Sequence, residues 1–132
     1  MFHDILVFIP NGALSSVQKK RLEDASPGSI FHYLEADELS SCDMELFDAA
    51  IGGVPPEWIK KARNLKWLQL TSAGANRYLE PGLLPEGAFL TCSTGAYGKA
   101  VSEHGFAMLL ALQKKLHRYR DQQRRGEWAD LG

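Results

Sequence analysis

The sequence has little cysteine, with only Cys42 and Cys92 among 132 residues. The two thiols form no C-x-x-C pair, which argues against a disulfide framework or a thiolate zinc motif. The four histidines also lack a ligand spacing to any cysteine or carboxylate. We therefore expect reduced thiols, no metal site, and a fold held together by its apolar core alone.

Long apolar runs and a strong excess of either charge are missing too. No run approaches the roughly 18 residues that would span a bilayer, so we expect no membrane segment. The first apolar stretch contains Asp4 and follows no basic region, unlike a signal peptide, and we expect a cytoplasmic protein. A formal net charge of −1 argues against a dedicated nucleic-acid binder.

Five short apolar segments predict a parallel sheet. They lie at 5–9, 30–34, 47–51, 65–70 and 88–92, and such continuous apolar runs are typical of strands buried on both faces. Pro10-Asn11-Gly12 closes the first segment and Gly52-Gly53 the third. Helical patterns between them begin at a Ser15 cap, near residue 38 and at Pro55-Pro56. This alternation predicts an α/β fold, a five-stranded, doubly wound, flavodoxin-like lobe over residues 1–98.

The last part of the chain differs in pattern and charge. Residues 1–98 hold eight basic and twelve acidic side chains, whereas residues 99–132 hold seven and four. Apolar residues recur at helical spacing from Lys99 to about Arg125, which predicts one long helix over 99–126. Residues 127–132 would then begin a further connection. The apolar stripe predicts association with a partner, and it contains Val101, Met108, Leu109, Leu112 and Leu116.

Several chemistries of five-stranded α/β lobes are excluded by the residues at the strand ends. A phosphate-accepting receiver domain needs carboxylates where Pro10-Asn11 and Gly52-Gly53 stand. A P-loop fails because Ser93 and Ala100 occupy positions that the motif requires to be Gly and Ser or Thr. No G-x-G-x-x-G is present, so we expect no dinucleotide-binding residues in this chain.

One loop has the composition of a ligand site. The predicted fourth strand delivers Ser72-Ala73-Gly74 at its carboxyl end, where open α/β sheets bind ligands. Small side chains let a ligand approach the backbone, and consecutive N–H groups can form a nest for an anion. An ordinary turn has the same composition.

Three segments together resemble one family. The strand and loop at 64–76, the strand, loop and helix start at 90–104, and Gly126-Glu127-Trp128 at the helix end are similar to the D-isomer-specific 2-hydroxyacid dehydrogenases. The family has a flavodoxin-like substrate lobe and a Rossmann coenzyme lobe, with the active site between them. The resemblance implies that this chain is the substrate lobe, truncated before the coenzyme lobe. Asn76 departs from the family, which usually has Asp there.

The resemblance also implies roles for individual residues. Backbone N–H groups of Ser72, Ala73 and Gly74 would bind the substrate carboxylate. Tyr97 would face the cleft and contact the substrate with its side chain, and Gly53 would border the same cleft. The family's catalytic Arg, carboxylate and His, and its coenzyme-binding glycines, lie in the other lobe. We therefore expect no catalytic residue in this chain.

The expected function follows from the resemblance. The full-length protein would transfer hydride between NAD or NADP and a small 2-hydroxy or 2-keto acid, and this chain alone would be inactive. The resemblance further implies a homodimer through helix 99–126. The alternative is a free-standing flavodoxin-like module that binds a ligand or regulates without catalysis.

Overall fold

A computed structural model describes residues 3–9 and 14–132 of the chain. The turn predicted at Pro10-Asn11-Gly12 lies outside these residues. The chain divides into two compact units, residues 1–94 and residues 95–132. Each unit is described by itself below.

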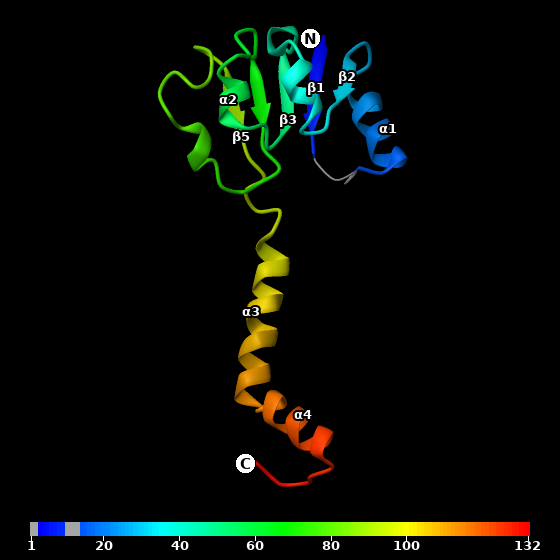
Figure 1. The fold of residues 1–132 in the computed structure, drawn as a ribbon, viewed down its shortest axis with the longest axis vertical. Helices are drawn as coiled ribbons and strands as arrows, with labels where there is room; N and C mark the ends of the chain where they lie inside the picture. The colour runs from blue at the N-terminus through cyan, green and yellow to red at the C-terminus, as the bar shows by residue number, and fades with distance from the viewer. Residues whose placement is uncertain (1–2, 10–13) are drawn as a thin grey trace. The chain divides into compact units, whose positions relative to one another are not determined.

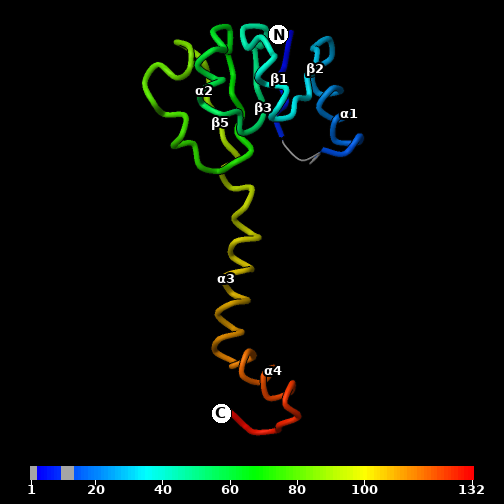
Figure 2. Tube along the Cα trace, viewed as in Figure 1, coloured from blue at the N-terminus to red at the C-terminus, as the bar shows by residue number. Residues whose placement is uncertain are grey.

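The first unit is built on five parallel strands in the order β2-β1-β3-β4-β5 (Figure 1). This is the flavodoxin-like order, so the predicted fold class is confirmed. Because every pair is parallel, all five strands end at the same edge of the sheet, as the backbone trace shows (Figure 2). The strands are β1 (Asp4–Phe8), β2 (Ile30–Tyr33), β3 (Ala49–Gly52), β4 (Trp67–Gln69) and β5 (Phe89–Thr91).

Short helices connect the strands. The first begins at the predicted cap: Gln18 N donates to Ser15 Oγ and Ser15 N donates to Gln18 Oε1, which satisfies two backbone donors at the helix start. The helix opened by Pro55-Pro56 makes a single turn. The helical segments of this unit are α1 (Ser16–Ala25), η1 (Glu38–Ser41), η2 (Met44–Leu46), α2 (Pro56–Ile59) and η3 (Asn76–Tyr78).

The second unit contains two helices, α3 (Gly98–Gln113) and α4 (Leu116–Arg125). The single helix predicted over 99–126 is therefore wrong in one respect, because it is interrupted at Lys114 and Lys115. Lys115 adopts a left-handed conformation with φ 52°, which ends α3 and starts α4 in a new direction. A left-handed residue that is not glycine costs about 1–2 kcal/mol, so other contacts must offset it.

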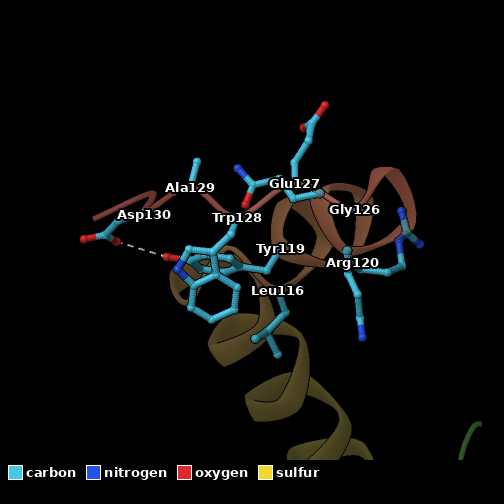
Figure 3. A pocket seen from close by; sticks show the side chains of 10 residues that line it. Leu116, Tyr119, Arg120, Gly126, Glu127, Trp128, Ala129 and Asp130 are labelled. Atoms are coloured by element: carbon cyan, nitrogen blue, oxygen red, sulfur yellow. Dashed lines mark hydrogen bonds between the residues drawn. The ribbon is translucent and has the colours of Figure 1, made fainter.

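Side chains of Lys115 and Tyr119 make hydrogen bonds with the last residues of the chain, and such bonds can offset this cost. The Lys115 ammonium donates to the carbonyl oxygens of Leu131 and Gly132. The Tyr119 hydroxyl donates to Asp130 Oδ1 at 3.3 Å and accepts from Leu131 N at 3.1 Å (Figure 3). The tail thus folds back along α4, and this long-range bonding explains a break that the lysines themselves do not signal.

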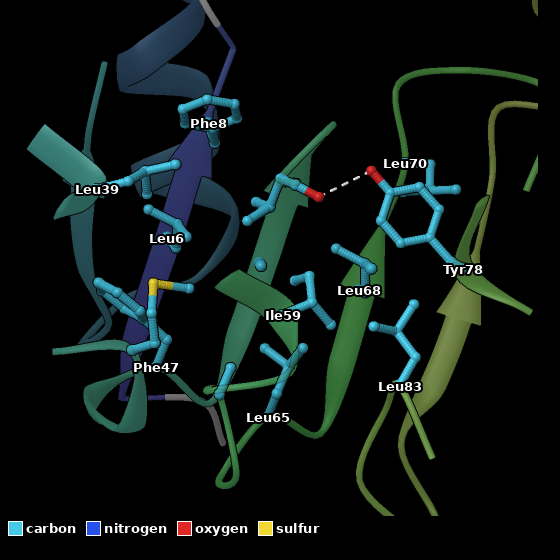
Figure 4. Close-up of a cluster of buried hydrophobic side chains, with 14 residues drawn as sticks. Leu6, Phe8, Leu39, Phe47, Ile59, Leu65, Leu68, Leu70, Tyr78 and Leu83 are labelled. Carbon is cyan, nitrogen blue, oxygen red and sulfur yellow. Dashed lines mark hydrogen bonds between the residues drawn. The ribbon is translucent and has the colours of Figure 1, made fainter. Parts of the chain in front are cut away.

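The core of the first unit lies on both faces of the sheet, as alternation along β1 requires. Leu6 and Phe8 point into the larger cluster with Ile59 of α2, while Ile5 and Val7 point into a smaller cluster on the other face. Helices therefore cover both faces, and the lobe is doubly wound. Figure 4 shows the larger cluster; its largest fully buried side chains are those of Phe47, Leu6, Leu39, Ile59, Leu68, Leu70, Leu83 and Val54.

Asp48 joins the amino ends of three strands. Its carboxylate accepts from His3 N at 3.0 Å and from Lys66 Nζ at 2.6 Å, just before β1 and β4 begin. The side chain is 15% exposed. The hydrogen bond from Lys66, then that from His3, lower the pKa of Asp48 to about 2.

Gly52 is required where β1 and β3 pair. Its φ is +122°, and a Cβ there would lie 1.8 Å from the carbonyl oxygen of Phe8, the residue paired with it. Backbone atoms of a central strand cannot move away cheaply. Gly53, the next residue, is exposed and would place a Cβ with no atom within 4 Å.

We expect Gly52→Ala to lower the free energy of unfolding by about 3 kcal/mol or more, because strain at a positive φ adds to overpacking. Urea unfolding followed by circular dichroism measures the loss. Gly53→Ala is the matched control and is expected to stay within about 0.5 kcal/mol of the wild type. A wild-type transition for Gly52→Ala would contradict the described pairing.

Removing the Asp48 carboxylate should change how stability depends on pH. The folded pKa lies below the ordinary value, so the carboxylate stabilises the fold above about pH 4, and this contribution is lost as the pH falls through about 2. Asp48→Asn is therefore expected to lower stability at neutral pH and to flatten its decline in acid. Unfolding curves over this pH range test it, with Asp37→Asn, an exposed residue without a capping bond, as control. An unchanged acid slope for Asp48→Asn would contradict the expectation.

Candidate functional site

The Ser72-Ala73-Gly74 loop lies directly after β4. Leu70 is fully buried, whereas residues 71–74 are exposed, so the chain leaves the core at this point. The loop is therefore at the carboxyl edge of a parallel sheet, as predicted, where ligands of open α/β folds bind.

The carbonyl oxygens and the N–H groups of this loop differ in their hydrogen bonding. The carbonyl oxygens accept bonds from the protein: the Ser72 hydroxyl donates to Gly74 O at 2.8 Å, and Ser93 N donates to Ser72 O at 2.9 Å. Within residues 3–9 and 14–132, the N–H groups of Ser72, Ala73 and Gly74 donate to no protein acceptor. The exposed loop thus keeps a run of backbone donors for a ligand, and such donors suit an anion.

Gly74 is not needed for packing. A Cβ built there would meet no atom within 4 Å, and its φ is outside the left-handed region. The fold therefore tolerates a side chain at this position. Its absence leaves the loop backbone open to close approach by a ligand.

Gly53 belongs to the same edge of the sheet, because β3 pairs with β4. A buried hydrogen bond connects the two strand ends: the Tyr78 hydroxyl donates to Val54 O at 2.9 Å (Figure 4). Burial raises the pKa of Tyr78, so this hydroxyl stays protonated and remains a donor. The sequence gives no signal for this bond, since an isolated tyrosine looks like any core aromatic residue.

Tyr97 lies in the second unit, immediately before α3, and its side chain is 49% exposed. Its contact with a substrate stays a prediction. Asn76 begins η3, and in the described residues its side chain makes no hydrogen bond, so the turn does not require a carboxylate there.

A positive charge lies close in sequence to the loop amides. Arg77 is exposed in η3, three residues after Gly74. No ion pair of Arg77 occurs among the residues that the structure describes. Its positive charge, on the segment that continues from the loop, has the sign that attracts an anion.

A hollow surface of about 890 Å³ lies in the second unit, between α4 and the tail (Figure 3). One of its walls is Trp128, whose side chain is fully exposed, so the hollow is an open surface rather than a formed pocket. None of the residues predicted to bind substrate lines it. The lining residues include Leu116, Tyr119, Arg120, Gly126, Glu127, Trp128 and Asp130.

Two kinds of feature are absent from the residues that the structure describes. They contain no group of three or more His, Cys, Asp or Glu side chains placed to hold a metal ion. None of their helices combines the length and apolar character needed to cross a membrane.

Comparison with known proteins gives structural matches only. No protein-family model matches the chain, and no curated protein matches it either. Among solved structures, it is similar to a D-isomer specific 2-hydroxyacid dehydrogenase family protein from Aeromonas salmonicida. That match has a TM-score of 0.75 and 25% sequence identity, and it covers 98% of this chain and 42% of the other.

Two further matches show the same fold. A phosphoglycerate dehydrogenase from Lactobacillus plantarum has a TM-score of 0.53 and 23% identity, covering 96% of this chain and 41% of the other. A pyruvate reductase of Chlamydomonas reinhardtii has a TM-score of 0.58 and 17% identity, covering 98% and 40%. The chain thus spans about two fifths of the length of these proteins. The comparisons confirm the resemblance that the loop and helix motifs predicted.

Proposed function

We propose that this chain is the substrate-binding lobe of an NAD(P)-dependent 2-hydroxyacid dehydrogenase. The observation that carries the proposal is the row of N–H groups at Ser72, Ala73 and Gly74, which are exposed at the carboxyl end of β4 and donate to no acceptor in the described part of the chain. The structural match to a 2-hydroxyacid dehydrogenase family protein supports it.

The proposed role of the loop is to bind and orient a carboxylate. A 2-keto or 2-hydroxy acid presents two carboxylate oxygens beside the reacting C2 atom, and adjacent backbone amides can donate to both. Fixing the carboxylate fixes C2, so the contribution of this chain is proximity and orientation. Arg77 would strengthen the attraction without contacting the reacting carbon.

The coenzyme does not fit the residues present. NAD or NADP would supply or accept the hydride when bound, yet this chain has no G-x-G-x-x-G and no residue that we assign to a dinucleotide. In this proposal the coenzyme and the acid–base groups belong to a further lobe of the whole protein. The chain alone is then expected to bind the acid without turning it over.

Amide signals of the ¹⁵N-labelled chain test the proposal. Titration with pyruvate is expected to shift the amide resonances of Ser72, Ala73 and Gly74, because these groups donate to the carboxylate. Gly74→Ala is expected to weaken binding by roughly tenfold, since a methyl group obstructs the approach to the backbone. Gly105→Ala, at an equally open position in α3, should bind as the wild type does. Shifts confined to other parts of the chain would refute the proposed site.

We also propose a homodimer that forms through the second unit. Between Gly105 and Gln113 α3 carries no charge, and its apolar residues surround the helix. A helix that is apolar on all sides is normally buried. The large apolar residues of α3 are each at least half exposed, namely Val101, Phe106, Met108, Leu109, Leu110 and Leu112.

Sedimentation equilibrium tests this association. The wild-type chain is expected to dimerise, and Leu109→Glu combined with Leu112→Glu should raise the dissociation constant at least about tenfold, because two charges would be buried. Val17→Glu, at an exposed apolar position in α1, should leave the equilibrium unchanged. A monomeric wild type at high concentration would count against the dimer.

A further inference from the structure

The loop that follows β5 contacts the candidate carboxylate-binding loop through Ser93 and Thr94. Ser93 is half-buried and donates twice to the neighbouring loop. Its amide donates to Ser72 O at 2.9 Å, and its hydroxyl donates to Leu70 O at 3.0 Å. Thr94 lies in the same segment, with its hydroxyl oxygen 3.5 Å from Ala73 O.

These bonds control the direction of the loop amides. In a trans peptide the C=O of one residue and the N–H of the next lie in one plane and point in opposite directions. Fixing Ser72 O therefore directs the Ala73 N–H away from β5, and fixing Ala73 O does the same for the Gly74 N–H. The donors thus face away from the protein groups that hold the carbonyls.

The hydroxyl of Ser93 holds Ser93 itself in place. Its bond to Leu70 O anchors Ser93 to the last buried residue after β4, where the backbone is already held by the ladder bond from Leu70 N to Thr91 O at 2.8 Å. With the hydroxyl bonded there, the Ser93 amide is held opposite Ser72 O. Without it, only one bond from Ser93 would restrain the exposed loop.

We infer that Ser93 is a positioning residue, which holds the Ser72–Gly74 loop so that its N–H groups converge on a carboxylate. The inference rests on the proposed function for the ligand. Its structural half, that Ser93 sets the conformation of the loop, stands independently of which anion binds.

The experiment compares three variants of the chain with the wild type. Ser93→Ala removes the hydroxyl bond, Ser93→Thr retains a hydroxyl, and Ser41→Ala removes an equivalent 3.0 Å bond from a serine hydroxyl to a carbonyl, that of Glu38, in η1. Amide chemical shifts of Ser72–Gly74 are recorded first without ligand and then during titration with pyruvate. Ser93→Cys replaces Ser93→Ala if the alanine variant does not fold.

We expect Ser93→Ala to move the ligand-free amide shifts of Ala73 and Gly74 and to raise the dissociation constant for pyruvate about threefold to tenfold. Ser93→Thr should restore both, and Ser41→Ala should change neither. Rescue by threonine would show that the hydroxyl at position 93 is responsible. Ser41→Ala loses a comparable hydrogen bond elsewhere, so a general loss of stability would change the shifts and affinity in that variant too.

Two results would overturn parts of this account separately. Wild-type shifts and affinity in Ser93→Ala would overturn the role of Ser93 and leave the proposed function standing. A wild-type chain that does not bind pyruvate would overturn the proposed ligand. In that case the ligand-free amide shifts of Ser93→Ala alone test the role of Ser93. Changed shifts at Ala73 and Gly74 would support that role, and unchanged shifts would overturn it.

Discussion

The parallel pairing of β3, β4 and β5 is the constraint on which the candidate site depends. Because the three strands run the same way, the segments that follow them emerge at one edge of the sheet. The loop after β5 can then donate to the loop after β4, and Tyr78 can reach Val54 after β3. An antiparallel β5 would place Ser93 at the opposite edge, and the loop amides would lose the groups that direct them.

Two glycines show how a requirement of the fold differs from a requirement of a ligand. Gly52 has a positive φ and no room for a Cβ beside Phe8 O, so pairing between β1 and β3 explains it completely. Gly74 has an ordinary φ and open space, so nothing within the first unit explains it. The second kind of glycine is the better pointer to a binding surface, because neither its backbone conformation nor its packing accounts for its small size.

The sequence predicted the fold more fully than the site. Five apolar segments and the Ser15 cap are local patterns, and each formed the element that was predicted. The break at Lys115 was not predicted, because the hydrogen bonds that accompany it run from the Lys115 ammonium to the carbonyl oxygens of Leu131 and Gly132, far along the chain. The Ser72-Ala73-Gly74 loop was predicted from its composition. Ser93 has no local signal, since its two hydrogen bonds go to carbonyls more than twenty residues earlier, those of Leu70 and Ser72 after β4.

The two units differ in how much of their apolar surface is buried. The first unit hides its apolar strands and, in the described residues, leaves no buried side-chain polar atom without a partner, so it has the interior of a self-sufficient domain. The second unit buries no residue of α3 or α4. Because α3 buries none of its apolar side chains, burial does not stabilise it. Its stability in this chain must come from the hydrogen bonds within the helix. The two exposed surfaces are therefore of opposite kinds: backbone amides after β4, and the apolar side chains of α3.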